Sequence, residues 1–160
     1  AAGPHISTGV ISLMGRRRAR ELAFMLLYSY EVQKDDHESQ RQLFVAENNL
    51  ADDDLTYFDR LLDGVSEHVA AIDERIAPTL NKWDITRLPL IDLTILRIGT
   101  FEMCYADDVP RAASINECVV LAKKYSNDES RAFINAVLGT IYRTLNPEQT
   151  PDETVFDEDT

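Results

Sequence analysis

Apolar residues recur at steps of three and four along most of the chain, which is the spacing of one buried face of an α-helix. The clearest stretch follows three aspartates at 52–54, whose charges suit the positive end of a helix. Its apolar positions are Leu55, Phe58, Leu62, Val65, Val69, Ile72 and Ile76. Pro78 limits the helix beyond them. The pattern therefore predicts one long helix that packs along a single seam.

Five further segments show helical spacing. Four are expected at about 17–33, 38–49, 90–105 and 115–125, with a short turn or helix at 83–89, and a final helix is expected after the polar residues 126–128. The segment 90–105 is apolar on nearly every side, so it predicts a central, mostly buried helix. Ser114 and Glu117 match a capping box, which places the start of the following helix just after Ser114. Asn146 and Pro147 are expected to end the last helix.

These patterns indicate an all-α protein. No segment alternates like a strand between hairpin turns, and six glycines are few for such turns. A division near 78–84 separates about three helices at 16–78 from three to four helices at 79–147. Residues 1–15 are expected to be a tag or a disordered arm, and residues 148–160 an acidic disordered tail. The residues expected to be almost fully buried are Leu62, Val69, Ile95, Ile98 and Val137.

Catalytic and metal-binding motifs are absent from the sequence. There is no CxxC, no HExxH, no calcium loop and no Gly-rich phosphate loop. The three histidines show no pattern with a nucleophile, so we expect no enzyme, no cofactor and no metal. Cys104 and Cys118 are expected to be free, buried thiols in a reducing cytoplasm. Charged residues interrupt even the most apolar segment, so we expect no membrane span.

The charge of the chain is strongly polarised. A net charge of −12 opposes unspecific binding to polyanions, because long-range repulsion acts against a phosphate backbone. Four of the 16 Lys and Arg residues nevertheless form one run, which consists of Arg16, Arg17, Arg18 and Arg20. Unbalanced acids crowd the other end of the chain, at Glu148, Asp152, Glu153, Asp157, Glu158 and Asp159.

The arginine run is the strongest candidate for binding chemistry. We expect it where a flexible arm enters the first helix. There Arg16 and Arg20 share a helix face, and Arg17 lies one turn from Arg20. Guanidinium groups in this arrangement grip successive phosphates or stack on bases. Short basic clusters are often only solvated, so the run by itself leaves RNA binding and a solvated surface both open.

Several segments together resemble the NusB family of transcription antitermination factors. They are RRRARELAFMLLYSYE at 16–31, YFDRLLDGV at 57–65, ILRIGTFEM at 95–103, DVPRAASINECVVLAKKY at 108–125 and SRAFINAVLGTI at 130–141. Their order matches the family, and the resemblance covers roughly 16–145. The segment before the arginine run and the acidic extension after Pro147 depart from the family pattern.

The resemblance implies two packed helical subdomains and a non-catalytic protein. It also implies binding to the boxA element of ribosomal-RNA leader transcripts, partnership with the ribosomal small-subunit protein NusE, and a place in the RNA polymerase antitermination complex. The RNA surface it implies comprises Arg16, Arg17, Arg18, Arg20, Tyr28, Lys123, Lys124, Tyr125, Glu129, Ser130 and Phe133. For Tyr28 and Phe133, core packing is the alternative to base stacking, and we favour packing. Asp92, expected to be an exposed acid, is the candidate contact for NusE.

Other functions stay open at this point. Helical domains of this family also occur fused to RNA cytosine methyltransferases, but 160 residues leave no room for a catalytic domain. A protein-only scaffold is the second alternative, including a homodimer in which the RNA site is occluded. The acidic tail either competes with RNA for the arginine run or keeps the protein soluble, and we favour solubility.

Overall fold

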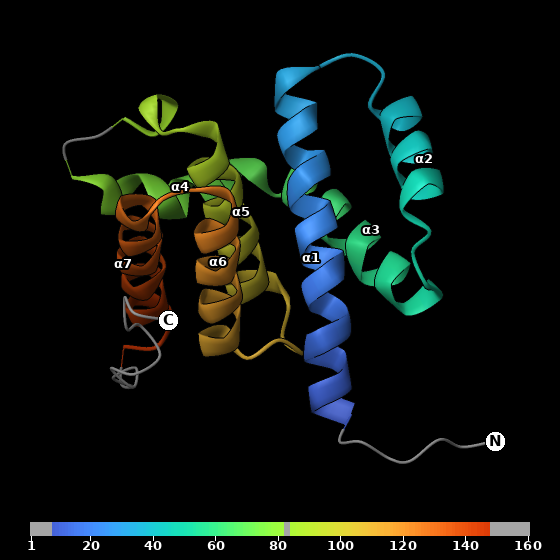
Figure 1. The fold of residues 1–160 in the computed structure, drawn as a ribbon. Coiled ribbons are helices and arrows are strands. Elements are labelled where there is room, and N and C mark those ends of the chain that lie inside the picture. Colours follow the sequence, from blue (N-terminus) through green and yellow to red (C-terminus); the bar gives the residue numbers. More distant parts are fainter. Residues whose placement is uncertain (1–7, 82–83, 148–160) are drawn as a thin grey trace. The chain divides into compact units, whose positions relative to one another are not determined.

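A computed structural model describes the backbone of residues 8–81 and 84–147, with side chains from residue 16 onward (Figure 1). Its helices are α1 (Thr8–Val32), α2 (His37–Asn48), α3 (Asp52–Glu67), α4 (Val69–Ile76), α5 (Leu90–Tyr105), α6 (Arg111–Tyr125) and α7 (Asp128–Leu145). Two short 3₁₀ helices, η1 (Ala77–Leu80) and η2 (Ile85–Arg87), lie between α4 and α5. No strand occurs in these described ranges, and the predicted all-α class is confirmed.

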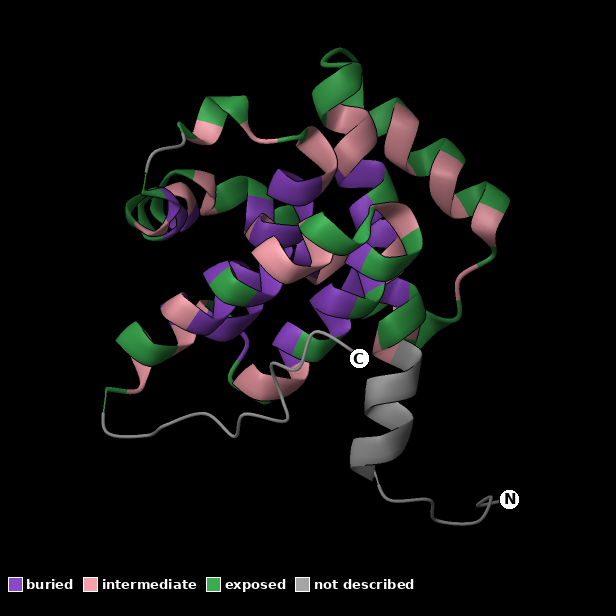
Figure 2. Cartoon of the chain, turned by 60° about the vertical axis from the view of Figure 1, so that its left-hand side comes forward, coloured by how far each residue is buried: buried purple, intermediate pink, exposed green. Residues whose placement is uncertain are grey.

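The chain divides into two compact units, unit 1 (Ala1–Asp63) and unit 2 (Gly64–Thr160). The boundary falls inside α3, earlier than the division expected near 78–84. The physical reason is the packing of α4, which contacts α5, η1 and α7 and therefore belongs with the C-terminal helices. Each unit has its own buried residues (Figure 2).

Unit 1 contains α1, α2 and most of α3. Helix α1 begins at Thr8 rather than near residue 17, so the arginine run lies within the helix and not at its entrance. Its buried side carries Ala19, Leu22, Ala23, Leu26 and Leu27. Helix α2 has no fully buried residue, but the Phe44 ring stacks on Phe58 of α3 with centroids 5.9 Å apart. Arg41 ties α2 to α3 by ion pairs with Asp59 at 2.6 Å and Asp63 at 2.7 Å.

The long helix predicted from the apolar seam is wrong, because the structure has two helices there. The backbone of His68 leaves helical geometry at φ −103° and ψ 14°, which ends α3 and starts α4. Apolar spacing continues through this break, so periodicity alone does not reveal it. The His68 ring stacks on Tyr105 with centroids 4.1 Å apart. Val69 follows the break and is only partly buried, in contrast to our prediction.

Unit 2 is organised around α5, which starts and ends where the sequence predicted. Nearly every residue from Asp92 to Met103 is buried, and α5 contacts α4, α6 and α7. A Cβ atom at Gly99 would lie 2.9 Å from the Cys118 sulfur and 2.9 Å from a methyl carbon of Leu138. Both α6 and α7 therefore approach α5 closely at Gly99, where an added Cβ would force the Cys118 or Leu138 side chain to shift.

Helix α6 begins at Arg111, one turn before the predicted capping box. Pro110 occupies the N-cap position, and its carbonyl accepts the amide of Ser114 at 3.0 Å. Ser114 is therefore an interior helix residue that is fully buried. Its hydroxyl donates to the buried carboxylate of Glu102 on α5 at 2.9 Å. The Ser114 hydroxyl therefore provides a hydrogen-bond partner for the buried Glu102 and does not cap the start of α6.

The central position of α5 gives a stability prediction. Ile95 is completely buried, and truncating it to alanine should lower the free energy of unfolding by about 2–5 kcal/mol through lost burial and a residual cavity. Urea unfolding followed by circular dichroism measures this change. Val120→Ala is the matched control, since Val120 is 39% exposed on α6 and its truncation should stay within about 0.5 kcal/mol. Equal effects of both substitutions would contradict the placement of the core.

Candidate nucleic-acid interface

In unit 1, the arginine run of α1 lies against Tyr57 of α3. The guanidinium carbon of Arg16 is 4.7 Å from the centre of the Tyr57 ring, and that of Arg20 is 5.8 Å from it. Arg60, one turn further along α3, is also 5.8 Å from this centre. The ring face is the negative end of the tyrosine quadrupole, so it attracts each cation and offsets their mutual repulsion. The buried Tyr57 ring thus lies beside the cationic groups of three arginines.

The four arginines of the run differ in their exposure. Arg17 and Arg18 are exposed and Arg16 is partly exposed, whereas Arg20 is only 1% exposed. Arg20 therefore does not share the surface position that we expected for all four. It sits on the buried side of α1, beside the Tyr57 ring. Arg18 donates to the backbone carbonyl of Asn48 at 3.0 Å, which anchors it at the negative end of α2.

Tyr28 lies two turns further along α1 and is partly exposed. Its ring meets that of Phe24 edge to face, with centroids 6.5 Å apart. Phe24 is buried, so Tyr28 packs on the core of unit 1 through one edge. The remaining ring surface is accessible to a ligand, which means that the packing and stacking interpretations are compatible.

In unit 2, the other predicted RNA residues gather where α6 ends and α7 begins. We call this group the α6–α7 cluster; it consists of Lys123, Lys124, Tyr125, Glu129, Ser130 and Phe133. Both lysines are exposed, and the ammonium of Lys124 lies 5.6 Å from the centre of the Tyr125 ring. The Asn127 side chain caps α7 by accepting the amide of Ser130 at 2.8 Å. This cap fixes the turn that brings the cluster together.

Asp92 is buried, which corrects our expectation of an exposed acid. It is 3% exposed in the first turn of α5, and its carboxylate accepts the hydroxyls of Ser130 at 2.9 Å and Ser126 at 3.4 Å. Burial raises the pKa of the Asp92 carboxyl, and the two serine hydrogen bonds oppose that rise. Periodicity suggested exposure because charged residues usually face water. Here the positive end of α5 and two hydroxyls accommodate the charge instead.

A cavity of about 400 Å³ adjoins the α6–α7 cluster. It is lined by Arg87, Leu88, Pro89, Asp92, Asn127, Glu129, Ser130 and Phe133. Phe133 offers an aromatic edge and the exposed Arg87 a cation, which is a combination that accommodates a nucleobase and its phosphate. Arg87 and Asn127 were not among the predicted residues. Asn127 could have been predicted as an N-cap, because it stands directly before the helical pattern of α7. The apolar periodicity gives no indication of a role for Arg87.

Within the described ranges, no group of three or more His, Cys, Asp or Glu side chains is arranged to hold a metal ion. No described helix is long and apolar enough to cross a membrane. Both cysteines are free: Cys118 is buried as predicted, whereas Cys104 is partly exposed. The described side chains thus offer basic and aromatic groups for contacts with a ligand, in two groups that belong to different units.

Comparison with known proteins gives a consistent family. The model of the NusB family matches residues 17–143. The transcription antitermination protein NusB of Ruminiclostridium cellulolyticum is 42% identical over 137 residues, which is 86% of this chain and 94% of that protein. The two segments that departed from the family pattern in sequence, before the arginine run and after Pro147, both lie outside the matched range.

Solved structures agree with this comparison. A crystal structure of the antitermination factors NusB and NusE in complex with double-stranded RNA superposes with a TM-score of 0.75 at 28% identity. It covers 82% of this chain and 98% of that chain. The NusB structure of T. maritima superposes with a TM-score of 0.72 at 30% identity and covers 88% of this chain and 96% of that chain.

The burial of Asp92 predicts a pH-dependent stability. A carboxyl with a raised folded pKa stabilises the fold below its unfolded value of about 3.8, and this contribution is lost as the pH rises through the folded pKa. An asparagine side chain does not ionise, so the Asp92→Asn variant does not undergo this loss. The free energy of unfolding of the variant minus that of the wild type should therefore increase as the pH rises from below about 3.8. Urea unfolding at a series of pH values measures the difference.

Asp84→Asn is the control with the opposite sign. The Thr86 amide donates to the Asp84 carboxylate at 2.9 Å and lowers the pKa of that carboxyl. Its stabilising contribution is therefore present above the unfolded pKa and is lost as the pH falls through the folded one. A difference between Asp92→Asn and wild type that stays constant with pH would show that Asp92 is not held in the buried site.

Proposed function

Because the chain belongs to the NusB family, we propose that it is an RNA-binding transcription antitermination factor that binds boxA RNA together with NusE. The observation that carries this proposal is the arginine run on α1. Its outer members are exposed, and Tyr57 holds its inner side in place. In a chain with a net charge of −12, this run is a local concentration of positive charge that can attract a polyanion. The named relatives support the proposal, since one of them was crystallised with NusE and double-stranded RNA.

The proposed contacts follow from exposure and charge. Arg16, Arg17 and Arg18 bind phosphates of the RNA, while Arg20 acts from the buried side as a positioning residue. In the α6–α7 cluster, the two lysines add phosphate contacts and the partly exposed Tyr125 stacks on a base. Tyr28 and Phe133 contribute their accessible ring edges. Glu129 and Ser130 offer polar groups that read the edge of a base.

The proposed setting is the cytoplasmic RNA polymerase antitermination complex. The partner that this family implies, NusE, is a basic ribosomal protein. Its docking would cover acidic surface of this chain and add positive side chains of its own. Asp92 would influence such a surface only through the positions of Ser126 and Ser130, because its own carboxylate is buried. A homodimer that occludes the arginine run would instead weaken RNA binding as the protein concentration rises.

The first test removes exposed arginines without disturbing the buried one. Arg17→Ala combined with Arg18→Ala should weaken boxA binding by at least about tenfold at low salt, because two phosphate contacts and their released counterions are lost. It should also flatten the dependence of affinity on salt. Fluorescence anisotropy with labelled boxA RNA measures both, with circular dichroism as a check of folding.

The matched control removes the same charge elsewhere. Lys34 and Arg143 are exposed and lie outside both proposed groups, so Lys34→Ala with Arg143→Ala makes an equal change in net charge. If both double variants lose affinity equally, long-range charge and not the arginine run determines binding. An unchanged affinity of the Arg17 and Arg18 variant would reject the assignment of the run.

The second test concerns cooperation between RNA and NusE. We expect NusE to add positive side chains beside the bound RNA, so that each ligand strengthens the other, and linkage requires the two effects to be equal, typically about 1–3 kcal/mol. BoxA RNA should therefore bind more tightly when NusE is saturating, and NusE should bind more tightly by the same factor when RNA is saturating. Titration calorimetry in both orders measures the two factors. Identical RNA affinities with and without NusE would reject cooperative assembly.

A further inference from the structure

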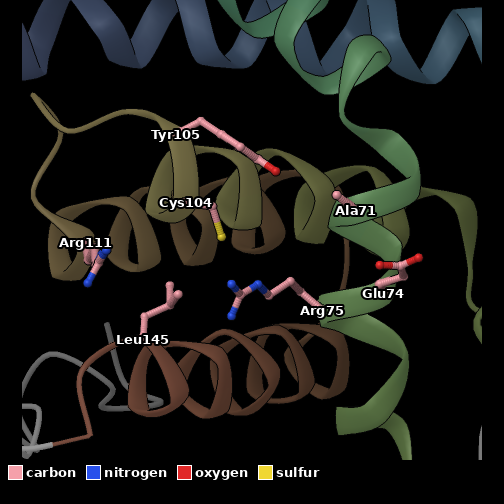
Figure 3. A pocket seen from close by; sticks show the side chains of 7 residues that line it. All are labelled: Ala71, Glu74, Arg75, Cys104, Tyr105, Arg111 and Leu145. Carbon is pink, nitrogen blue, oxygen red and sulfur yellow. The ribbon is translucent and has the colours of Figure 1, made fainter.

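Unit 2 has another cavity, of about 510 Å³, which no part of the proposed RNA surface uses. It lies among α4, α5, α6 and the end of α7, and its lining residues are Ala71, Glu74, Arg75, Cys104, Tyr105, Arg111 and Leu145 (Figure 3). Two of these residues are arginines from different helices. In Figure 3 the Arg75 guanidinium extends away from Glu74 and toward the side of the cavity where Arg111 lies. The cavity therefore presents positive charge from two directions.

Arg111 is held rigidly at this cavity. Its Nε donates to the backbone carbonyl of Met103 at 3.0 Å, and one Nη donates to the Asn146 side-chain oxygen at 2.8 Å. A guanidinium has five N–H groups, so these two bonds leave donors for a further acceptor. Because the side chain is already fixed, little entropy is lost when an anion binds.

Cys104 lies at the cavity that Arg75 and Arg111 also line. Burial raises the pKa of its thiol, and the charges of Arg75 and Arg111 oppose this rise. An anion bound between them would cancel that influence and would also cover the thiol. Cys118 is fully buried, so Cys104 is the accessible thiol of the two cysteines in the chain.

We propose that this cavity is a carboxylate-binding site and that its occupant is the acidic C-terminal segment of the same chain, through Glu148, Asp152 and Glu153. The inference is independent of RNA binding. Leu145 lines the cavity and Asn146 holds Arg111, so the segment leaves α7 at the rim of the site. Glu148 follows Leu145 by three residues, a reach of at most about 10 Å for an extended chain.

The sequence of the segment fits such a site. Residues 148–160 contain six acids and no Lys or Arg, so their charge is not compensated internally. Tethering raises the effective concentration of these carboxylates near the cavity into the millimolar range. Arginine and carboxylate also match in geometry, since two parallel N–H groups meet two oxygens. Occupation of the site would hide Cys104.

The test measures the alkylation rate of Cys104 by iodoacetamide, a small neutral reagent, with mass spectrometry to locate the label. The full chain at low salt should react several-fold more slowly than a full-length variant carrying Glu148→Gln, Asp152→Asn and Glu153→Gln. Covering and a higher thiol pKa both slow the reaction when the carboxylates are bound. High salt should speed up the wild type and leave the variant little changed. Unlabelled Cys118 confirms that each protein stays folded.

Two matched controls make the result specific. Asp157→Asn, Glu158→Gln and Asp159→Asn remove the same charge from the distal part of the segment and should leave the rate near that of the wild type. In proteins that carry Arg75→Gln, the alkylation rate of Cys104 should be the same with and without the three proximal acids. Arg143→Gln, an exposed arginine of α7 outside the cavity, should preserve the rate difference that these acids make. Each arginine variant is compared with and without the three proximal acids, so the direct effect of Arg75 on the thiol is the same in both and cancels.

Several outcomes would overturn the proposal. Equal rates for the wild type and the proximal variant would leave the segment as a solubility element only. Equal effects of the proximal and distal neutralisations would indicate general electrostatics in place of a site. Protection that appears only after inorganic phosphate or RNA is added would assign the cavity to a phosphate ligand.

Discussion

Helix α5 has almost no face that can meet water, and this constraint determines the arrangement of unit 2. An α-helix with apolar residues on all sides must be enclosed by other elements, because each exposed apolar surface weakens the fold. Helices α4, α6 and α7 supply that enclosure. The close approach at Gly99 and the buried pair of Glu102 with Ser114 show that the enclosure is tight and also polar where it must be. The α6–α7 cluster and the cavity beside it are built on the ends of these enclosing helices.

Charge is organised by uncharged residues in this protein. The chain is strongly acidic, yet three arginines converge on the face of Tyr57 in unit 1. The neutral ring attracts them and offsets part of their mutual repulsion, so a buried aromatic side chain contributes to the basic surface of α1. In unit 2, the cap formed by Asn127 has a similar part, since it sets the turn that carries the lysines and Tyr125. The positions of individual basic side chains, more than the net charge of the chain, therefore determine where positive groups lie on the surface.

The sequence predicted those features that arise from local pattern. Helix α5 was predicted with its correct bounds because its apolar run is bracketed by Pro89 and by Asp107 with Asp108, and the arginine run was visible because like charges stand together. Features that depend on tertiary contacts were missed. The break at His68 is hidden by continuous apolar spacing, and the burial of Asp92 depends on hydroxyls that arrive from α6 and α7. Tyr57 and Arg87 gained their roles only from neighbours distant in sequence.

The boundary between the two units lies inside α3, between Asp63 and Gly64, and this has a consequence for how the protein unfolds. The first twelve residues of the helix support one core and its last four belong to the other. Helical hydrogen bonds join residues four apart, so a loss of helical structure at one end of α3 weakens the turns that follow it. Melting of either unit would fray the helix that the other one uses. Folding cooperativity can therefore pass along the backbone of α3, so that a local loss of order is felt by both halves of the chain.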